Sequence, residues 1–125
     1  MLKNIPNTKT YRTFAKIMKS LGAEVLLNTY INNNRELTAN SAWNTTTEMY
    51  LPAGTSIICS QSCYIYQFGD NDSYLRSYRA DAGTSYPVDQ YVNNYSYIRV
   101  MFYSKYTLFT ITNSSTGQIL LKYEK

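Results

Sequence analysis

The 125-residue chain contains no histidine, so the commonest general base of enzymes is missing. Its eight acidic residues are spread singly, and only two carboxylates that meet in space could support a glycosidase-type reaction. Two cysteines without histidine cannot supply the four ligands of a structural zinc ion. The composition therefore favours a protein that is not an enzyme and that needs no cofactor.

The two cysteines, Cys59 and Cys63, are separated by three residues. On one extended strand their Cα atoms would lie about 13 Å apart, which is too far for a disulfide bond. A turn at residues 60–62 would bring them together. Because structural disulfide bonds are rare in cytosolic proteins, we expect two free, partly buried thiols.

Long apolar runs are also missing. No stretch approaches the roughly 20 apolar residues of a membrane span, and the first residues do not have the pattern of a signal peptide. We expect a soluble protein that is made in the cytoplasm. Five basic residues precede the first acidic residue, Glu24, and account for the net charge of +4. The remainder is near neutral, so we expect no binding to nucleic acid.

Residues 8–21 have a helical period, with apolar side chains on one face and basic side chains on the other. Asn7 or Thr8 can cap the helix, and Gly22 can end it. The pattern predicts a basic amphipathic segment over residues 1–22, which would pack on the β domain, on copies of itself or on a larger assembly. The residues expected to form its apolar face are Tyr11, Phe14, Met18 and Leu21.

The rest of the chain is typical of β structure, because it is rich in tyrosine and only 16% of all residues are charged. Strand-like segments alternate with clusters of Asn, Ser, Thr, Gly and Asp, as in sandwiches and barrels. This pattern predicts a β-sandwich domain over residues 23–125. Its expected strands, about eight in number, are 25–31, 46–51, 56–59, 64–68, 74–79, 97–103, 106–112 and 119–123.

Four clusters of turn-forming residues, at 32–34, 52–54, 69–72 and 113–117, separate these strands. The last cluster predicts a hairpin between the final two strands. In the third, Asp70 and Asp72 have the alternating oxygen atoms that calcium prefers, but the glycine and distant glutamate of a calcium-binding loop are missing. A turn is the simpler interpretation, and a weak cation site is the alternative.

Two aromatic features suggest ligand contact. Trp43 is followed by amide and hydroxyl side chains, as in sites that stack on sugar rings, with burial in the core as the alternative. The stretch 86–97 combines tyrosine with Asn and Ser, as antibody paratopes do. The alternation of residues 95–102 would instead place every second side chain in the core. The outward-facing tyrosines would then mark a ligand site or a subunit interface. The candidate contact residues are Trp43, Tyr86, Tyr91 and Tyr95.

Three runs of sequence carry a resemblance to a known module. They contain a Trp before a strand and a Pro-Ala-Gly-Thr turn (43–57), an aromatic strand that ends in Gly-Asp (64–75), and a Tyr-Ile-Arg-Val strand (97–102). With these motifs, residues 25–112 resemble the jelly-roll β-sandwich of fibre and receptor-binding proteins of tailed bacteriophages and of bacterial carbohydrate-binding modules. The resemblance implies a mainly β, jelly-roll-like antiparallel sandwich with one N-terminal helix.

The same resemblance implies a structural virion protein, namely a tail-fibre, head-fibre, baseplate or decoration subunit displayed for host attachment or assembly. It implies a homotrimer, host glycans as partners, and contact with other virion proteins through residues 1–22. The alternatives are a free-standing carbohydrate-binding module or a bacterial adhesin domain, and a glycan-active enzyme.

Overall fold

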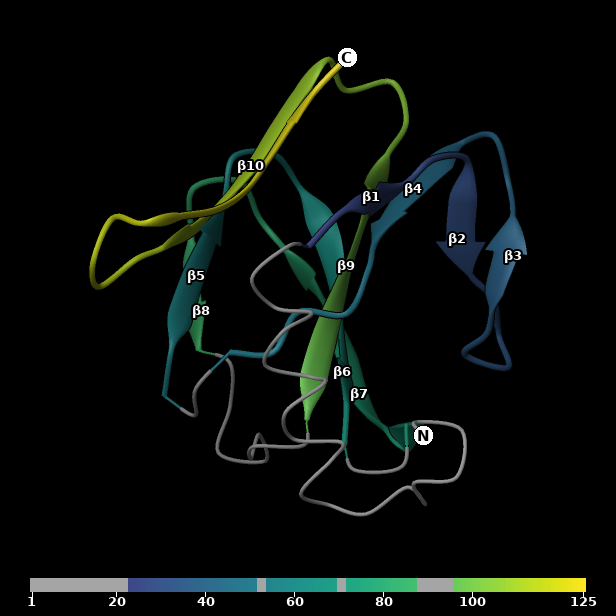
Figure 1. The fold of residues 1–125 in the computed structure, drawn as a ribbon, viewed down its shortest axis with the longest axis horizontal. Helices are drawn as coiled ribbons and strands as arrows, with labels where there is room; N and C mark the ends of the chain where they lie inside the picture. Colours follow the sequence, from purple (N-terminus) through teal and green to yellow (C-terminus); the bar gives the residue numbers. More distant parts are fainter. Residues whose placement is uncertain (1–22, 52–53, 70–71, 88–95) are drawn as a thin grey trace, which may run out of the picture.

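The computed structural model describes residues 23–51, 54–69, 72–87 and 96–125 (Figure 1). No helix within these ranges is long and apolar enough to cross a membrane. The predicted mainly β, antiparallel structure is confirmed. The expected helix, with Tyr11, Phe14, Met18 and Leu21, lies outside the described residues. The strands are β1 (Val25–Leu26), β2 (Thr29–Ile31), β3 (Leu37–Ala39), β4 (Trp43–Thr46), β5 (Ser56–Cys59), β6 (Cys63–Phe68), β7 (Tyr74–Ala80), β8 (Ser85–Pro87), β9 (Tyr97–Tyr103), β10 (Leu108–Asn113) and β11 (Ile119–Glu124).

The strands form three antiparallel sheets. A five-stranded sheet has the order β1-β4-β9-β6-β7, a four-stranded sheet has the order β11-β10-β5-β8, and β2 pairs with β3. Figure 1 shows the two larger sheets beside each other, with the β2–β3 hairpin on the far side of the five-stranded sheet. The predicted terminal hairpin is confirmed as β10 and β11.

Both larger sheets contribute to one hydrophobic core. Alternate residues of β9, Ile98, Val100 and Phe102, are buried in this core, as the period of two predicts. Phe102 stacks on Phe109 of β10, in the other sheet, with ring centroids 4.1 Å apart. The opposite face of β9 is also largely covered, since Tyr97 is 4% exposed and Met101 is 6% exposed.

The β2–β3 hairpin covers part of that opposite face. Its Ile31 backbone N–H donates to the Met101 sulfur over 3.4 Å, and the Arg35 guanidinium lies 4.1 Å from the centre of the Tyr74 ring. The single strand predicted at 25–31 is wrong, because Asn28 has a φ of 53° and separates β1 from β2. Positive φ ends extended structure and is tolerated well by Asn.

The strand predicted at 46–51 is also misplaced, because β4 spans Trp43–Thr46 and Met49 makes only an isolated bridge with Ile98. Polar Asn44 and Thr46 are nevertheless buried in β4. The Asn44 side-chain oxygen accepts the Asn28 N–H at 2.9 Å, and the Thr46 hydroxyl oxygen accepts the Val100 N–H at 2.9 Å. These long-range hydrogen bonds offset the cost of burying the two polar side chains.

The turn at residues 60–62 carries the chain from β5 in one sheet to β6 in the other. Cys59 and Cys63 therefore both enter the core, 2% and 1% exposed, as free thiols. The prediction of free thiols is confirmed, and their burial is more complete than expected. A hydrogen bond to Cys59, burial and the charge of the Cys59 thiolate all raise the pKa of the Cys63 thiol.

Candidate functional site

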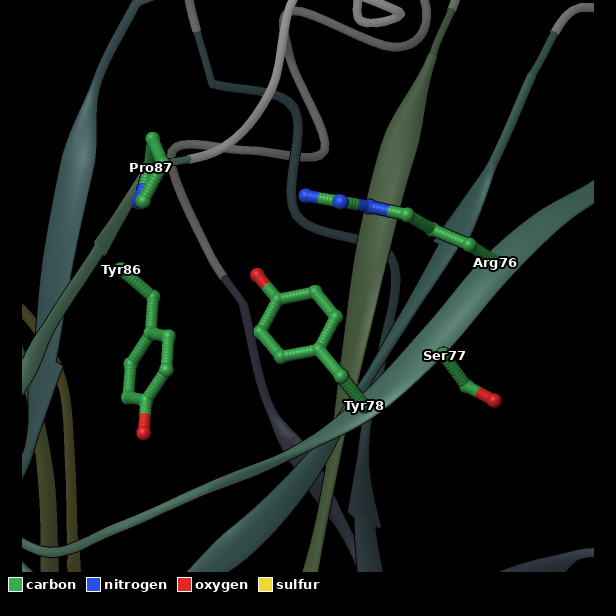
Figure 2. A pocket seen from close by; sticks show the side chains of 5 residues that line it. All are labelled: Arg76, Ser77, Tyr78, Tyr86 and Pro87. Carbon is green, nitrogen blue, oxygen red and sulfur yellow. The ribbon is translucent and has the colours of Figure 1, made fainter.

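A pocket of about 250 Å³ opens between β7 and β8. These strands are the last members of the five-stranded and four-stranded sheets, so the pocket lies where the space between the sheets reaches the surface. Pro87 ends β8, a position that suits an edge strand because proline cannot donate to a further neighbour. The lining residues are Arg76, Ser77, Tyr78, Tyr86 and Pro87 (Figure 2).

Two tyrosines form facing walls of this pocket. The Tyr78 and Tyr86 ring centroids lie 5.6 Å apart with their planes inclined by 40°, and both residues pack against the core. The Tyr86 hydroxyl oxygen accepts the backbone N–H of Asp81 at 3.0 Å. Figure 2 shows Ser77 pointing away from the gap, where its hydroxyl bonds that of Tyr74 at 2.8 Å. The core and the Asp81 bond thus hold the aromatic walls in place.

Arg76 extends from β7 across the mouth of the pocket toward β8 (Figure 2). Its Nε donates to the side-chain oxygen of Gln67 at 2.8 Å, and its guanidinium carbon lies 4.8 Å from the centre of the Tyr78 ring. Gln67 is opposite Arg76 in the β6–β7 pair. The cation is therefore oriented by an amide on one side and an aromatic face on another.

Gln67 is fully buried, and its amide nitrogen has no hydrogen-bond partner among the described residues. An unsatisfied buried donor costs about 1–3 kcal/mol. The side-chain oxygen of Gln67 faces Arg76 and orients its guanidinium, while the amide nitrogen of Gln67 is left without a described partner. Such a cost is more typical of a functional site than of an optimised core.

The chain matches no family model, no curated protein and no solved structure. The chemistry of the pocket is the basis for its interpretation. It combines a fixed cation, two phenol rings and a small volume, which together suit one compact ligand group with both polar and apolar surfaces.

Trp43 lies apart from this pocket, on the outer face of the five-stranded sheet. It is half-buried, stacks on Tyr103 at 4.4 Å and meets Tyr64 edge-on at 5.7 Å. It does not belong to the core between the sheets. The structure therefore separates two predicted contact residues, Trp43 and Tyr86, while Tyr91 and Tyr95 lie outside the described residues.

The possible cation site is only partly described, since Asp70 lies outside the described residues. Asp72 accepts a 2.8 Å hydrogen bond from the Tyr97 hydroxyl. Among the described residues no group of three or more His, Cys, Asp or Glu side chains could hold a metal ion. The Asp72 carboxylate thus has a defined structural contact.

Glu48 and Asp72 lie at the same pair of tyrosines, Tyr50 and Tyr97, whose ring centroids are 5.3 Å apart. Burial raises the pKa of Tyr50, with further increases from the charge of Glu48 and a hydrogen bond to it. Burial is also the largest cause of the raised pKa of Tyr97, and the hydrogen bond of Tyr97 to Asp72 raises this pKa further. Both phenols are therefore held in the neutral form.

Sequence reasoning identified Tyr86 but missed Arg76, Tyr78 and Gln67. A usable signal was present, because Arg76 and Tyr78 are two residues apart on a predicted strand and must share a face. Their approach to Tyr86 depends on how the edges of two different sheets meet, which no local pattern encodes.

Proposed function

We propose that this chain is a non-enzymatic binding module of a bacteriophage virion, displayed for host attachment, which binds a glycan in the pocket between β7 and β8. The observation that carries the proposal is the pocket itself, where two fixed tyrosine rings face each other beneath an oriented guanidinium. The sequence resemblance to phage receptor-binding modules supports the virion setting.

A glycan fits this chemistry better than a purely apolar ligand. Sugar rings have apolar faces that pack on aromatic side chains and hydroxyl groups that accept hydrogen bonds. Tyrosine supplies contact area at a low cost in conformational entropy. The volume of about 250 Å³ lies below the usual range for drug-sized ligands, so we propose that the pocket takes one sugar unit.

We further propose that the two larger sheets form an antiparallel β-sandwich around their common core. Jelly rolls and immunoglobulin-type sandwiches are both built from Greek-key connections. The antiparallel pairs β4–β9, β5–β8 and β6–β7 are nested in the sequence and alternate between the two sheets, as in the folded-over ribbon of a jelly roll. The strand order thus supports a jelly roll more directly than an immunoglobulin-type sandwich, since β10 pairs with β5 and β11 and not with β9.

Residues 1–22 complete the proposal as a basic anchoring or oligomerising segment, with a homotrimer and other virion proteins as its partners. The concentration of positive charge before Glu24 and the apolar period of residues 8–21 support this role.

Glycan binding is tested by applying the full chain to a glycan array. The affinity for each glycan that binds on the array is then measured by isothermal titration calorimetry. Tyr86→Ala should abolish binding, and Tyr86→Phe should retain most of it because the ring remains. Tyr74→Ala is a matched control, since Tyr74 is an exposed tyrosine of β7 outside the pocket lining. Binding by a folded Tyr86→Ala variant at the wild-type level would overturn the proposed site.

Assembly is tested separately by light scattering over a range of concentrations. We expect a trimer that dissociates when Phe14, Met18 and Leu21 are replaced by serine, while the circular dichroism of the β domain is unchanged. A wild-type monomer would contradict the assembly role and favour a free-standing carbohydrate-binding module.

A further inference from the structure

We propose that Cys59 and Cys63 are a site of reversible oxidation, where an intrachain disulfide bond forms when the protein meets a disulfide oxidant. The two thiols are free in the structure. Cys59 is the last residue of β5, and Cys63 is the first residue of β6. The bond therefore links the two larger sheets covalently at the point where the chain passes between them. This inference does not depend on the proposed glycan pocket.

The contact between the two thiols is the first support. Both side chains are buried in the same hydrophobic core, and a hydrogen bond joins the Cys63 thiol to Cys59. Sulfur atoms within hydrogen-bonding reach of each other need a rotation of the side chains to approach the S–S bond length of about 2.05 Å. The fold thus brings together two cysteines that a single extended strand would hold apart.

The turn at residues 60–62 is the second support, because hydrogen bonds hold both of its ends. The Ser60 backbone N–H donates to the Thr110 carbonyl oxygen at 3.0 Å, and the Ser60 hydroxyl oxygen accepts the Thr110 N–H at 2.8 Å. The Tyr106 hydroxyl donates to the Ser62 carbonyl oxygen at 3.0 Å. Folding therefore fixes the two thiols beside each other before any bond joins them. Reacting groups that are held together in this way have a high effective concentration for each other.

The reaction is a thiol–disulfide exchange in two steps. One cysteine loses its proton, and its sulfur attacks the S–S bond of the oxidant, which gives a mixed disulfide and releases one thiolate. The other cysteine then loses its proton and displaces the second thiolate, so the bond between Cys59 and Cys63 forms. The two protons pass through the solvent to the released thiolates, and the oxidant gains the two electrons that the cysteines lose.

The burial of the pair decides when this reaction starts. Burial and the hydrogen bond to Cys59 raise the pKa of the Cys63 thiol, which keeps that thiol protonated in the closed fold. Exchange therefore begins when the turn opens or before folding is complete. In a reducing cytoplasm the thiols stay free, and in oxidising surroundings the bond forms. Because it closes only a short loop, the bond stabilises the fold less than a disulfide across a long loop.

The test measures the equilibrium constant for oxidation of the full chain by glutathione disulfide, in native buffer and in urea. Samples reach equilibrium at several ratios of oxidised to reduced glutathione, are quenched with acid and are analysed by mass spectrometry. The intrachain bond lowers the mass by two hydrogen atoms, whereas a mixed disulfide adds glutathione. We expect the constant to be about tenfold larger or more in native buffer, because the fold holds the thiols together. The folding equilibrium constant of the oxidised chain should then be larger by the same factor.

Two variants are matched controls, since Cys59→Ala and Cys63→Ala each leave one thiol without its partner. Under the same conditions each variant should form only the mixed disulfide with glutathione, and no species that is lighter by two hydrogen atoms. The circular dichroism of the oxidised wild-type chain should equal that of the reduced chain, because the bond forms between side chains that already lie in the core.

An equilibrium constant in native buffer equal to or below the constant in urea would overturn the proposal, because the fold would then not favour the bond. Glutathione bound to both cysteines of one chain would overturn it as well, and so would an oxidised chain that has lost its β circular dichroism. Each of these results can be obtained from the wild-type chain alone. None of them affects the outcome of the glycan array, so the failure of this inference is distinguishable from the failure of the proposed function.

Discussion

The ring of Phe102 in β9 stacks almost parallel on the ring of Phe109 in β10, with centroids 4.1 Å apart and planes inclined by 7°. Both side chains are fully buried, and each belongs to a different sheet. This pair is therefore a direct contact between the two layers, and truncating it should weaken the packing of one layer on the other.

Phe102→Ala should lower the free energy of unfolding by about 3–5 kcal/mol, because it removes buried apolar surface and leaves a cavity. Urea denaturation followed by circular dichroism measures this change. Leu108→Ala is the control, since Leu108 is an exposed residue of β10 and its loss should cost less than about 1 kcal/mol. Equal losses for the two variants would contradict the assignment of Phe102 to the core.

Alkaline pH should destabilise the fold through Tyr50 and Tyr97, whose pKa values are raised by burial and by neighbouring carboxylates. In the unfolded chain a tyrosine ionises near pH 10, at about its reference value. Folding favours the neutral phenols, so their contribution to stability is complete below about pH 10 and is lost as the pH rises further. The expected result is a free energy of unfolding that decreases steadily above about pH 10.

Absorbance at 295 nm checks this expectation directly, because it counts ionised tyrosines. Fewer than the 14 tyrosines of the chain should ionise before the alkaline unfolding transition. In the Tyr97→Phe variant the decrease in stability above pH 10 should be smaller, since one buried phenol is gone. Ionisation of all tyrosines within an intact fold would contradict the burial of Tyr50 and Tyr97.

Strands with clear alternation could be predicted from the sequence. The predicted bounds of β5 and β9 agree with the structure because turn-forming residues flank them and every second residue of β9 is apolar. β4 was misplaced because Asn44, Thr45 and Thr46 have the composition of a loop. Their burial depends on hydrogen bonds to residues far away in the sequence, such as Asn28 and Val100.

Only part of the candidate site could be predicted from the sequence, for a related reason. Tyr86 belongs to a stretch whose composition indicates contact, whereas Arg76 and Tyr78 belong to a strand that looks like any other. β3 and β8 were missed, since each has only three residues and little alternation to detect. Because the pocket forms between β7 and the missed strand β8, its position required the tertiary structure.

The thiols of Cys59 and Cys63 should be chemically inert in the folded protein. Both are buried, and the raised pKa of Cys63 reduces the thiolate that reacts with disulfide reagents. Ellman's reagent should therefore detect no thiol in the native protein and both thiols in denaturant. The Cys59→Ala variant should release one thiol under denaturing conditions. Rapid labelling of the native chain would show that the turn at 60–62 opens readily.

The ring contacts of Trp43 with Tyr64 and Tyr103 can be tested by fluorescence. Trp43 is the only tryptophan of the chain, so its emission reports one environment. Removing the stacked ring in Tyr103→Ala exposes the indole, so the emission maximum should shift to longer wavelength. The lost aromatic pair should also lower the free energy of unfolding by about 0.5–1.5 kcal/mol beyond the lost burial. Tyr74→Ala should leave the emission unchanged, since none of the Trp43 ring contacts involves Tyr74. An unshifted spectrum in Tyr103→Ala would mean that other groups shield Trp43, and the stacking assignment would be wrong.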